Sequence, residues 1–240
     1  MPQIAPSAMV DKAAELADDV CVGAFTCIGP GVRIGPGCVI ENNVTIVGQT
    51  TIGARTRVSP LAVIGVAETP GETPGQCLIG EASALREHVT VYGGQQAPTR
   101  IGNDDLIMIG CQVGAGADVG DHVILANCTH VGAGARVEDY VRTSGFTTVA
   151  PGATVGAFTF TAGYSEVHRD VPPFAMIQGS PYRVRGVNSE NLHRCGFGED
   201  DVRALKQAFR ELFNGGSTPA DLEAARRVLA LSGLRLIGLH

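Results

Sequence analysis

The chain has 240 residues, a net charge of −6, 32 glycines, 5% aromatic residues and no tryptophan. No apolar run approaches the roughly 20 residues that a membrane-spanning helix needs, and an acidic chain of this kind is unsuited to bind nucleic acid. The N-terminus lacks a basic region followed by an apolar stretch, so we expect no signal peptide and predict a cytoplasmic protein.

From Ile4 onward, an aliphatic residue recurs at every sixth position. The register runs through Val10, Leu16, Val22, Ile28, Ile34, Ile40, Ile46, Ile52, Val58 and Ile64, resumes at Ile79, Leu85 and Val91, and continues from Ile101 to Val167 with threonine only at Thr143 and Thr161. A six-residue period fits neither an α-helix nor an alternating strand. It is typical of a parallel β-helix of hexapeptide repeats, in which three repeats close one coil of about 18 residues. We therefore predict a mainly β fold.

Two interruptions break this register. Ile64 is followed in the register by Ile79, and Val91 is followed by Ile101, so both steps are longer than one hexapeptide. Insertions into a solenoid leave its core intact and form loops, often on the working face. We expect such loops near residues 66–78 and 92–100, and a loop without function is the alternative.

The chain changes character after Val167. Pro172, Pro173 and Pro181 are expected to end the coil, because proline cannot donate to a central sheet. Helical spacing of apolar residues then predicts a short turn over 191–195, a helix over 199–213 and a second helix that begins near Pro219. We divide the chain into a β-helix over 1–185 and a C-terminal helical domain over 186–240. These helices should pack on the end of the coil or on a neighbouring subunit.

The distribution of charge indicates possible partners, and the cysteines indicate the redox compartment. Residues 1–180 contain 9 basic and 17 acidic residues, whereas residues 181–240 contain 9 basic and 7 acidic ones. An anionic partner near the C-terminal end is therefore favoured, and a solvated surface is the alternative. The 7 cysteines lack the CxxC spacing of a zinc or redox site, which favours buried or half-buried thiols in a reducing compartment.

Four segments carry a family resemblance in their order and spacing. They are LREHVTVYGG (85–94), DHVILANCTHVGAGARVEDY (121–140), RDVPPFAMIQGSP (169–181) and GVNSENLHRCGF (186–197). With the two loops, they resemble the UDP-N-acetylglucosamine O-acyltransferases that begin lipid A synthesis, over almost the full length. The resemblance implies a left-handed parallel β-helix, a homotrimer with active sites between subunits, acyl carrier protein as acyl donor, a UDP-sugar acceptor, and neither metal nor cofactor.

The resemblance also shows what is missing from this chain. Acyl transfer from a thioester to a hydroxyl needs a base and donors for the oxyanion. The position of the family's catalytic His is Ala115, which cannot accept a proton. The other cleft histidines of the family correspond to Tyr92, Gln112, Gly134 and Ala150. The family mechanism therefore cannot operate unchanged here, and Gln112 becomes a candidate for contact with substrate.

The segment that the resemblance associates with the nucleotide matches the family better than the positions of the cleft histidines do. Asn188, Glu190 and Arg194 occupy positions that the resemblance associates with the nucleotide, and an amide, a carboxylate and a guanidinium together suit a uracil edge and phosphate. The next arginine of the family is Cys195 here, which weakens the expected affinity for pyrophosphate. The alternative role of these residues is helix capping and a surface ion pair.

Two histidines are candidates for a relocated base. In a coil of three hexapeptides, stacked positions lie about 4.8 Å apart, which places His130 over Gln112 and His168 over Ala150. A solvated histidine on a solenoid surface is the alternative in both cases. His122 belongs to a different face.

Three functions remain open from the sequence. The first is an acyltransferase that uses an acyl thioester and a UDP-sugar, with a relocated base or an amine acceptor. The second is a non-catalytic paralogue that binds a nucleotide sugar and has a binding or regulatory role. The third, a carbonic anhydrase built on hexapeptide repeats, needs closely spaced imidazoles, whereas His122 and His130 are expected on different faces.

Overall fold

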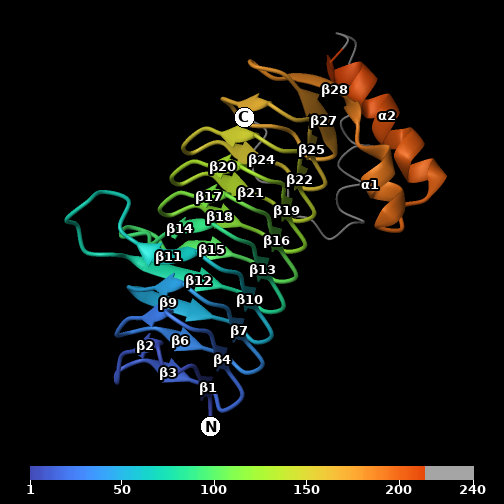
Figure 1. Ribbon diagram of the computed structural model, residues 1–240. Helices are drawn as coiled ribbons and strands as arrows, with labels where there is room; N and C mark the ends of the chain where they lie inside the picture. Colours follow the sequence, from blue (N-terminus) through green and yellow to red (C-terminus); the bar gives the residue numbers. More distant parts are fainter. Residues whose placement is uncertain (214–240) are drawn as a thin grey trace.

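The computed structural model describes residues 1–213 and shows a three-sided parallel β-helix that carries helices at its C-terminal end (Figure 1). Each side is a sheet of short strands stacked along the coil axis. Sheet A contains β1 (Gln3–Ile4), β4 (Cys21–Val22), β7 (Val39–Ile40), β10 (Arg57–Val58), β13 (Ala84–Leu85), β16 (Leu106–Ile107), β19 (Ile124–Leu125), β22 (Arg142–Thr143), β25 (Phe160–Thr161), β27 (Ala175–Gln178) and β28 (Arg183–Val187).

The other two sheets complete the coil. Sheet B contains β2 (Met9–Val10), β5 (Cys27–Ile28), β8 (Thr45–Ile46), β11 (Val63–Val66), β14 (Thr90–Tyr92), β17 (Gln112–Val113), β20 (His130–Val131), β23 (Thr148–Val149) and β26 (Glu166–Val167). Sheet C contains β3 (Glu15–Leu16), β6 (Arg33–Ile34), β9 (Gln49–Ile52), β12 (Gln76–Ile79), β15 (Thr99–Ile101), β18 (Asp118–Val119), β21 (Arg136–Val137) and β24 (Thr154–Val155).

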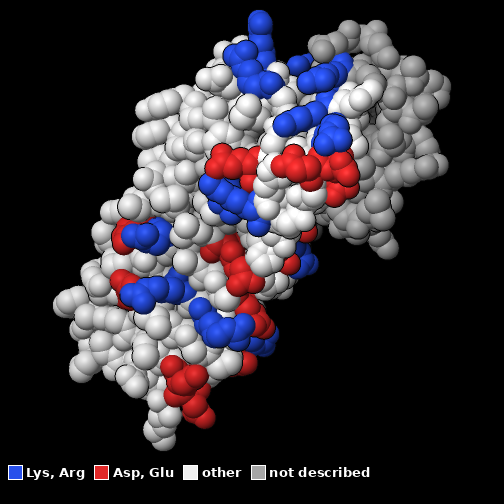
Figure 2. All heavy atoms as spheres, turned by 90° about the vertical axis from the view of Figure 1, so that its right-hand side faces the viewer, with Lys and Arg blue, Asp and Glu red and all other residues white. Residues whose placement is uncertain are grey.

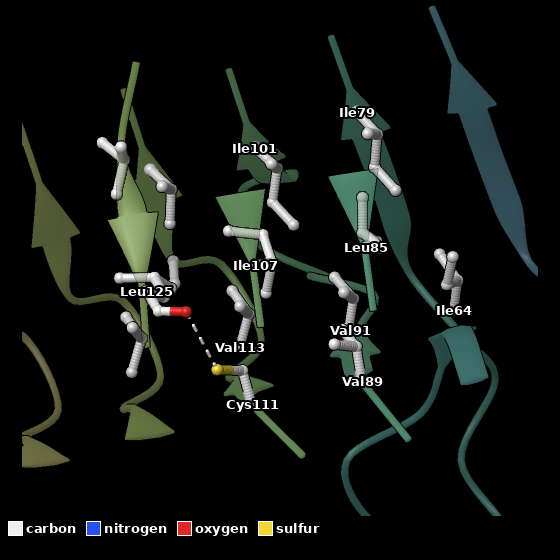
Figure 3. Close-up of a cluster of buried hydrophobic side chains, with 14 of the residues drawn as sticks. Ile64, Ile79, Leu85, Val89, Val91, Ile101, Ile107, Cys111, Val113 and Leu125 are labelled. Carbon is white, nitrogen blue, oxygen red and sulfur yellow. Dashed lines mark hydrogen bonds between the residues drawn. The ribbon is translucent and has the colours of Figure 1, made fainter. Parts of the chain in front are cut away.

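The six-residue register places its aliphatic side chains inside the coil. Gln3 pairs with Cys21 and Gln112 pairs with His130, so an uninterrupted coil contains three hexapeptide repeats. Neighbouring strands point their register residues into one continuous core (Figure 3). Burial of each such side chain contributes about 1.5–3 kcal/mol. The predicted parallel β-helix of hexapeptide repeats is confirmed.

Cysteines behave as small apolar residues in this interior. Cys38, Cys77 and Cys111 are buried, and the remaining cysteines are half-buried thiols, as predicted. The Cys111 thiol bonds to the Leu125 carbonyl at 3.5 Å (Figure 3). Burial raises the pKa of Cys111 to about 11 and that of Cys77 to about 12. These thiols stay protonated near neutral pH and contribute packing rather than nucleophilic chemistry.

One corner of the coil carries a column of stacked rings. His122, Tyr140, Phe158 and Phe174 occupy equivalent corner positions between sheets C and A, with φ of 58°, 58°, 58° and 63°. This left-handed conformation costs a residue other than glycine roughly 1–2 kcal/mol. The rings stack at centroid distances of 4.7, 4.7 and 5.6 Å. Each such contact stabilises the fold by about 0.5–1.5 kcal/mol.

Both interruptions of the register form loops on the sheet B and sheet C side of the coil. The longer loop follows β11 and projects from the coil (Figure 1), and the shorter one follows β14. Gln95 in the shorter loop donates from Nε2 to the Thr73 carbonyl in the longer loop, at 2.9 Å. An isolated bridge between Gln76 and Gly94 adds a second link. The two loops therefore form one connected feature.

The end of the coil differs from the prediction. Pro172 and Pro173 do not end it, because β27 follows them and pairs in parallel with β25. The prolines lie at a corner, where no ladder bond is required of them, and the next residue, Phe174, donates from its backbone to the Ala157 carbonyl at 2.7 Å. The coil ends where β28 turns back antiparallel to β27.

Two helices pack against this end. Helix α1 (Ser189–Arg194) begins two residues earlier than predicted, whereas α2 (Glu199–Phe213) has the predicted bounds. A buried cluster joins them to the ring column: Phe158, Phe174, Val187, Leu192, Val202 and Leu205. The helix predicted from Pro219 lies outside the described residues. Within residues 1–213, no helix is long and apolar enough to cross a membrane.

Candidate active site

A polar stripe on sheet B contains two of the predicted site residues. Gln112 on β17 donates from Nε2 to the Tyr92 hydroxyl at 2.8 Å, and its backbone neighbour in the ladder is His130 on β20. His130 is exposed, and its imidazole makes no hydrogen bond or ion pair within residues 1–213. The stripe thus contains a phenol, an amide and an imidazole, and a neutral imidazole has one nitrogen that can accept a proton.

The corner between sheets B and C, which follows this stripe, carries only small side chains. Ala115 lies here, and its carbonyl accepts from the backbone N–H of Gly134 at 3.0 Å in the next coil. Gly134 and Gly152 have φ of 63° and 72°, and a Cβ at either position would meet nothing within 4 Å. This corner is open to solvent and offers no proton-accepting side chain at the positions where the resemblance expects imidazoles.

His168 lies apart from this stripe. It follows β26, whose Val167 pairs with Val149, so His168 is one coil beyond Ala150. It is exposed, and its ring packs 5.4 Å from the ring of Tyr182. The structure therefore places His130 and His168 on different coils, with no contact between them.

A pocket of about 450 Å³ lies between the outer face of sheet A and α1. We call it the α1 pocket. Its lining residues are Ile124, Arg142, Thr143, Phe160, Met176, Val187, Asn188, Ser189, Glu190, Asn191 and Arg194. The three residues predicted to meet a nucleotide, Asn188, Glu190 and Arg194, are all among them. Figure 2 shows the side of the molecule that carries sheet A and the helices, where Lys and Arg at the C-terminal end have no Asp or Glu among them on this face.

Asn188 also has a structural role in this pocket. It is the N-cap of α1, where its Oδ1 accepts from the Asn191 backbone at 3.5 Å, and its Nδ2 donates to the Phe158 carbonyl at 2.9 Å. Asn191 in turn donates from Nδ2 to the Tyr140 carbonyl at 3.0 Å. The two amides attach α1 to the backbone of the ring column, at Phe158 and Tyr140. They therefore fix the shape of the pocket even where they do not touch a ligand.

Glu190 and Arg194 form an ion pair across one turn of α1. Both side chains are more than half exposed, at 78% and 58%, so the pair adds little to stability. The capping and ion-pair roles considered as alternatives from the sequence are therefore both present. A ligand that displaced Glu190 would bind the Arg194 guanidinium, which already lies at the pocket.

Arg142 is a pocket residue that the sequence reasoning missed. It is half-buried on β22, between Ile124 and Phe160 in the sheet A ladder. Its place on the outward side of the coil could be read from the register, because it directly precedes the inward Thr143. The register does not reveal that α1 folds back over this position.

Asp105 is a second unexpected residue, inside the coil near the start of β16. It is 2% exposed, and its Oδ2 has no hydrogen-bond partner within the described chain. Burial, the largest cause, raises its pKa to about 8, although Oδ1 accepts from the Val123 backbone at 2.7 Å. Asp105 lines neither the polar stripe nor the α1 pocket, so we interpret it as a determinant of stability rather than of chemistry.

Two family models match separate parts of this chain. A family model for domain 2 of UDP N-acetylglucosamine O-acyltransferase matches residues 170–235, and a model for bacterial transferase hexapeptide repeats matches residues 13–48. The acyl-[acyl-carrier-protein]–UDP-N-acetylglucosamine O-acyltransferase of Saccharophagus degradans is 43% identical over 94% of this chain and 88% of its own length. The protein of the same name from Polynucleobacter asymbioticus is 52% identical over 97% and 91%.

The chain belongs to the UDP-N-acetylglucosamine O-acyltransferase family. Solved structures agree with this: UDP-N-acetylglucosamine acyltransferase from Francisella novicida superposes with a TM-score of 0.89 at 26% identity, over 96% of this chain and 87% of that one. The enzyme of the same name from Campylobacter jejuni gives 0.86 at 28% identity, over 98% and 92%. The family resemblance and the fold class are confirmed, and the chain is an acyltransferase. The roles of Gln112, His130, His168, Asn188, Glu190 and Arg194 stay predictions.

Proposed function

We propose that this acyltransferase moves an acyl group from the thioester of an acyl carrier protein to a UDP-sugar whose nucleotide lies in the α1 pocket. The names of the relatives give acyl carrier protein and UDP-N-acetylglucosamine as their reactants. The observation that carries the proposal to this chain is the α1 pocket, where Asn188, Glu190 and Arg194 converge. A carboxylate, an amide and a guanidinium suit a uracil edge and a phosphate.

We infer that the complete site is formed by more than one copy of the chain. The α1 pocket opens on sheet A, whereas Ala115 and the neighbouring stripe lie at sheet B and its corner with sheet C. That corner is the edge of the coil opposite sheet A. In a homotrimer, the corner of one subunit would face the α1 pocket of the next, so that the acceptor held by one subunit reaches the chemistry of another.

Transfer follows the ordinary balance of thioester chemistry. The acceptor oxygen or nitrogen attacks the thioester carbonyl, and the tetrahedral intermediate then expels the thiolate of the carrier, which takes up a proton. A hydroxyl must lose its proton during attack, and His130 is our candidate to accept it. An amine attacks in its neutral form, so it depends less on a base. Because Ala115 accepts no proton, we expect slow transfer to a hydroxyl and faster transfer to an amino sugar.

A panel of acceptors tests this proposal. The purified protein is incubated with acyl carrier protein that bears 3-hydroxyacyl chains, together with UDP-N-acetylglucosamine or its 3-amino analogue. Loss of a general base typically costs 10²–10⁴-fold, and we expect a difference of that order between the two acceptors. His130→Gln should further slow hydroxyl transfer, whereas His122→Gln, at a corner where its ring stacks on Tyr140, should not.

Each result separates the functions considered. Fast hydroxyl transfer that is insensitive to His130→Gln would contradict the role of this imidazole as base. Binding of UDP without transfer to either acceptor would favour a nucleotide-sugar-binding protein with a regulatory role. A monomer in light scattering would contradict a site built between subunits.

A further inference from the structure

Arg142 differs from the other arginines of residues 1–213 in its combination of burial and lack of a partner. Within residues 1–213, only Arg86 and Arg142 are half-buried arginines, and the others are exposed. Arg86 pairs with Glu87 at 3.1 Å. The Arg142 guanidinium makes no hydrogen bond and no ion pair with any residue from 1 to 213. A partly desolvated charge without a partner is costly, so such a group is expected to meet an anion.

The surroundings of Arg142 hold its charged end at the α1 pocket. Its ladder neighbours on sheet A are Ile124 and Phe160, which provide apolar surface for the stem of the side chain. Arg142 lines the same pocket as Glu190 and Arg194 of α1. At the C-cap of that helix, burial raises the pKa of the Cys195 thiol, and the positive charge of Arg142 opposes that effect. Sheet A thus presents a cation directly toward the helix that carries Arg194.

The charges that line the pocket leave Arg142 uncompensated. Its ionised lining residues are Arg142, Glu190 and Arg194, and Glu190 is already paired with Arg194. Arg142, on the facing strand β22, is therefore the ionised lining residue of the pocket that has no partner among the other lining residues.

We propose that Arg142 is a binding residue for the diphosphate group of the nucleotide sugar in the α1 pocket. The identity of the ligand rests on the proposed function, whereas the anion site itself does not. A guanidinium binds phosphate oxygens through two parallel N–H donors, and this geometry distinguishes it from lysine. Arg142 and Arg194 then contact the diphosphate from opposite walls, and Glu190 is released toward the uracil.

Calorimetry with three probes tests this assignment. Uridine, UDP and inorganic pyrophosphate are titrated into the wild-type protein, Arg142→Met and Arg142→Lys. The matched control is Arg203→Met, which removes an exposed arginine paired with Asp200 on α2. Methionine preserves the apolar stem between Ile124 and Phe160, and lysine keeps the charge without the two-donor geometry. Thermal unfolding and light scattering of each variant verify its fold and its association.

Loss of a charge-assisted contact should weaken UDP and pyrophosphate binding about 10- to 100-fold in Arg142→Met. Arg142→Lys should fall between Arg142→Met and wild type, uridine affinity should not change, and Arg203→Met should match wild type. Pyrophosphate binding that depends on Arg142, in a protein that binds neither UDP nor uridine, would support the anion site and contradict the nucleotide part of the proposed function. Unchanged UDP and pyrophosphate affinities in Arg142→Met would overturn the assignment.

Two other results also overturn it. If the wild-type protein binds none of the three probes, the pocket holds no anion of this class. If Arg142→Met dissociates the oligomer and leaves the affinities of the surviving species unchanged, Arg142 pairs with an acid of a second copy of the chain.

Discussion

The open corner at Ala115 and the α1 pocket contrast within one fold. The corner is lined by alanine, glycine and proline, and a Cβ added at Gly134 would touch nothing. The α1 pocket is enclosed by a strand face and a helix that two asparagine amides fix in place. A solenoid can lose side chains from an open corner at almost no cost in stability, because none of them packs in the core. Replacement of the asparagine side chains that hold α1 in position would cost more stability, because the helix would lose its attachment to the coil.

The strongest test of this contrast removes the support of the α1 pocket. Phe174 is 1% exposed and packs against Phe158 and Phe197 at centroid distances of 5.6 and 6.3 Å. Phe174→Ala should lower the free energy of unfolding by about 3–5 kcal/mol and abolish UDP binding, as followed by urea unfolding and calorimetry. Phe146→Ala, at a ring that is 52% exposed, is the control and should cost about 1 kcal/mol. Equal costs would contradict a special role for the ring column.

The next largest effect is expected when an imidazole is added to the corner at Ala115. Ala115→His should raise the rate of acyl transfer to the hydroxyl of UDP-N-acetylglucosamine by about 10²-fold, because it supplies a proton acceptor. Ala133→His puts the same imidazole one coil later and is the matched control. Initial rates with acyl-loaded carrier protein measure both. Equal rates for the two variants would mean that position 115 has no special relation to the acceptor.

The fold's own pH dependence must be separated from that of the chemistry. The pKa of Asp105 is raised to about 8, so its protonated form is favoured by folding. Its contribution to stability is complete below its ordinary pKa near 4 and is lost as the pH rises through about 8, at up to about 1.4 kcal/mol per pH unit. Asp105→Asn should flatten this dependence in urea unfolding between pH 5 and 9. The pH dependence measured for Asp105→Asn, which comes from the other titrating groups, is subtracted from that of the wild type. If the remaining stability rises with pH over this window, the prediction is refuted.

The smallest expected effect concerns the exposed ion pair of α1. Arg194→Ala should lower the free energy of unfolding by less than about 0.5 kcal/mol, yet weaken UDP binding if Arg194 meets phosphate. Arg203→Ala removes a comparable pair with Asp200 on α2 and should leave UDP binding intact. Thermal unfolding and calorimetry report the two effects separately. Equal UDP affinity in the two variants would restrict Arg194 to a structural role.

The coil was predictable because its information is local and repeated. Each aliphatic residue of the register reports the inward side of one short strand, and the pairing of Gln112 with His130 follows from counting three repeats along the chain. The end of the coil was predicted less well. Proline was expected to break the sheet at Pro172 and Pro173, but at a corner it disrupts no ladder, and β27 continues beyond it.

The candidate site was predictable only where sequence neighbours form it. Asn188, Glu190 and Arg194 are close in the chain and lie in or next to one short helix, so their convergence follows from α1. Arg142 is far from them in sequence, and its approach depends on the way β28 directs α1 back over sheet A. A six-residue pattern contains no signal for that return.

The antiparallel turn from β27 to β28 has a consequence for the dynamics of the coil. Each coil of a solenoid contacts only its neighbours, so local opening spreads from one coil to the next. The α1 pocket is lined by Ile124, Arg142, Phe160 and Met176, which come from successive strands of sheet A. A bound ligand would therefore connect coils that otherwise communicate only through adjacent ones. Amide hydrogen exchange would slow together in β19, β22, β25 and β27, while exchange in β1, β2 and β3 would continue at its unliganded rate.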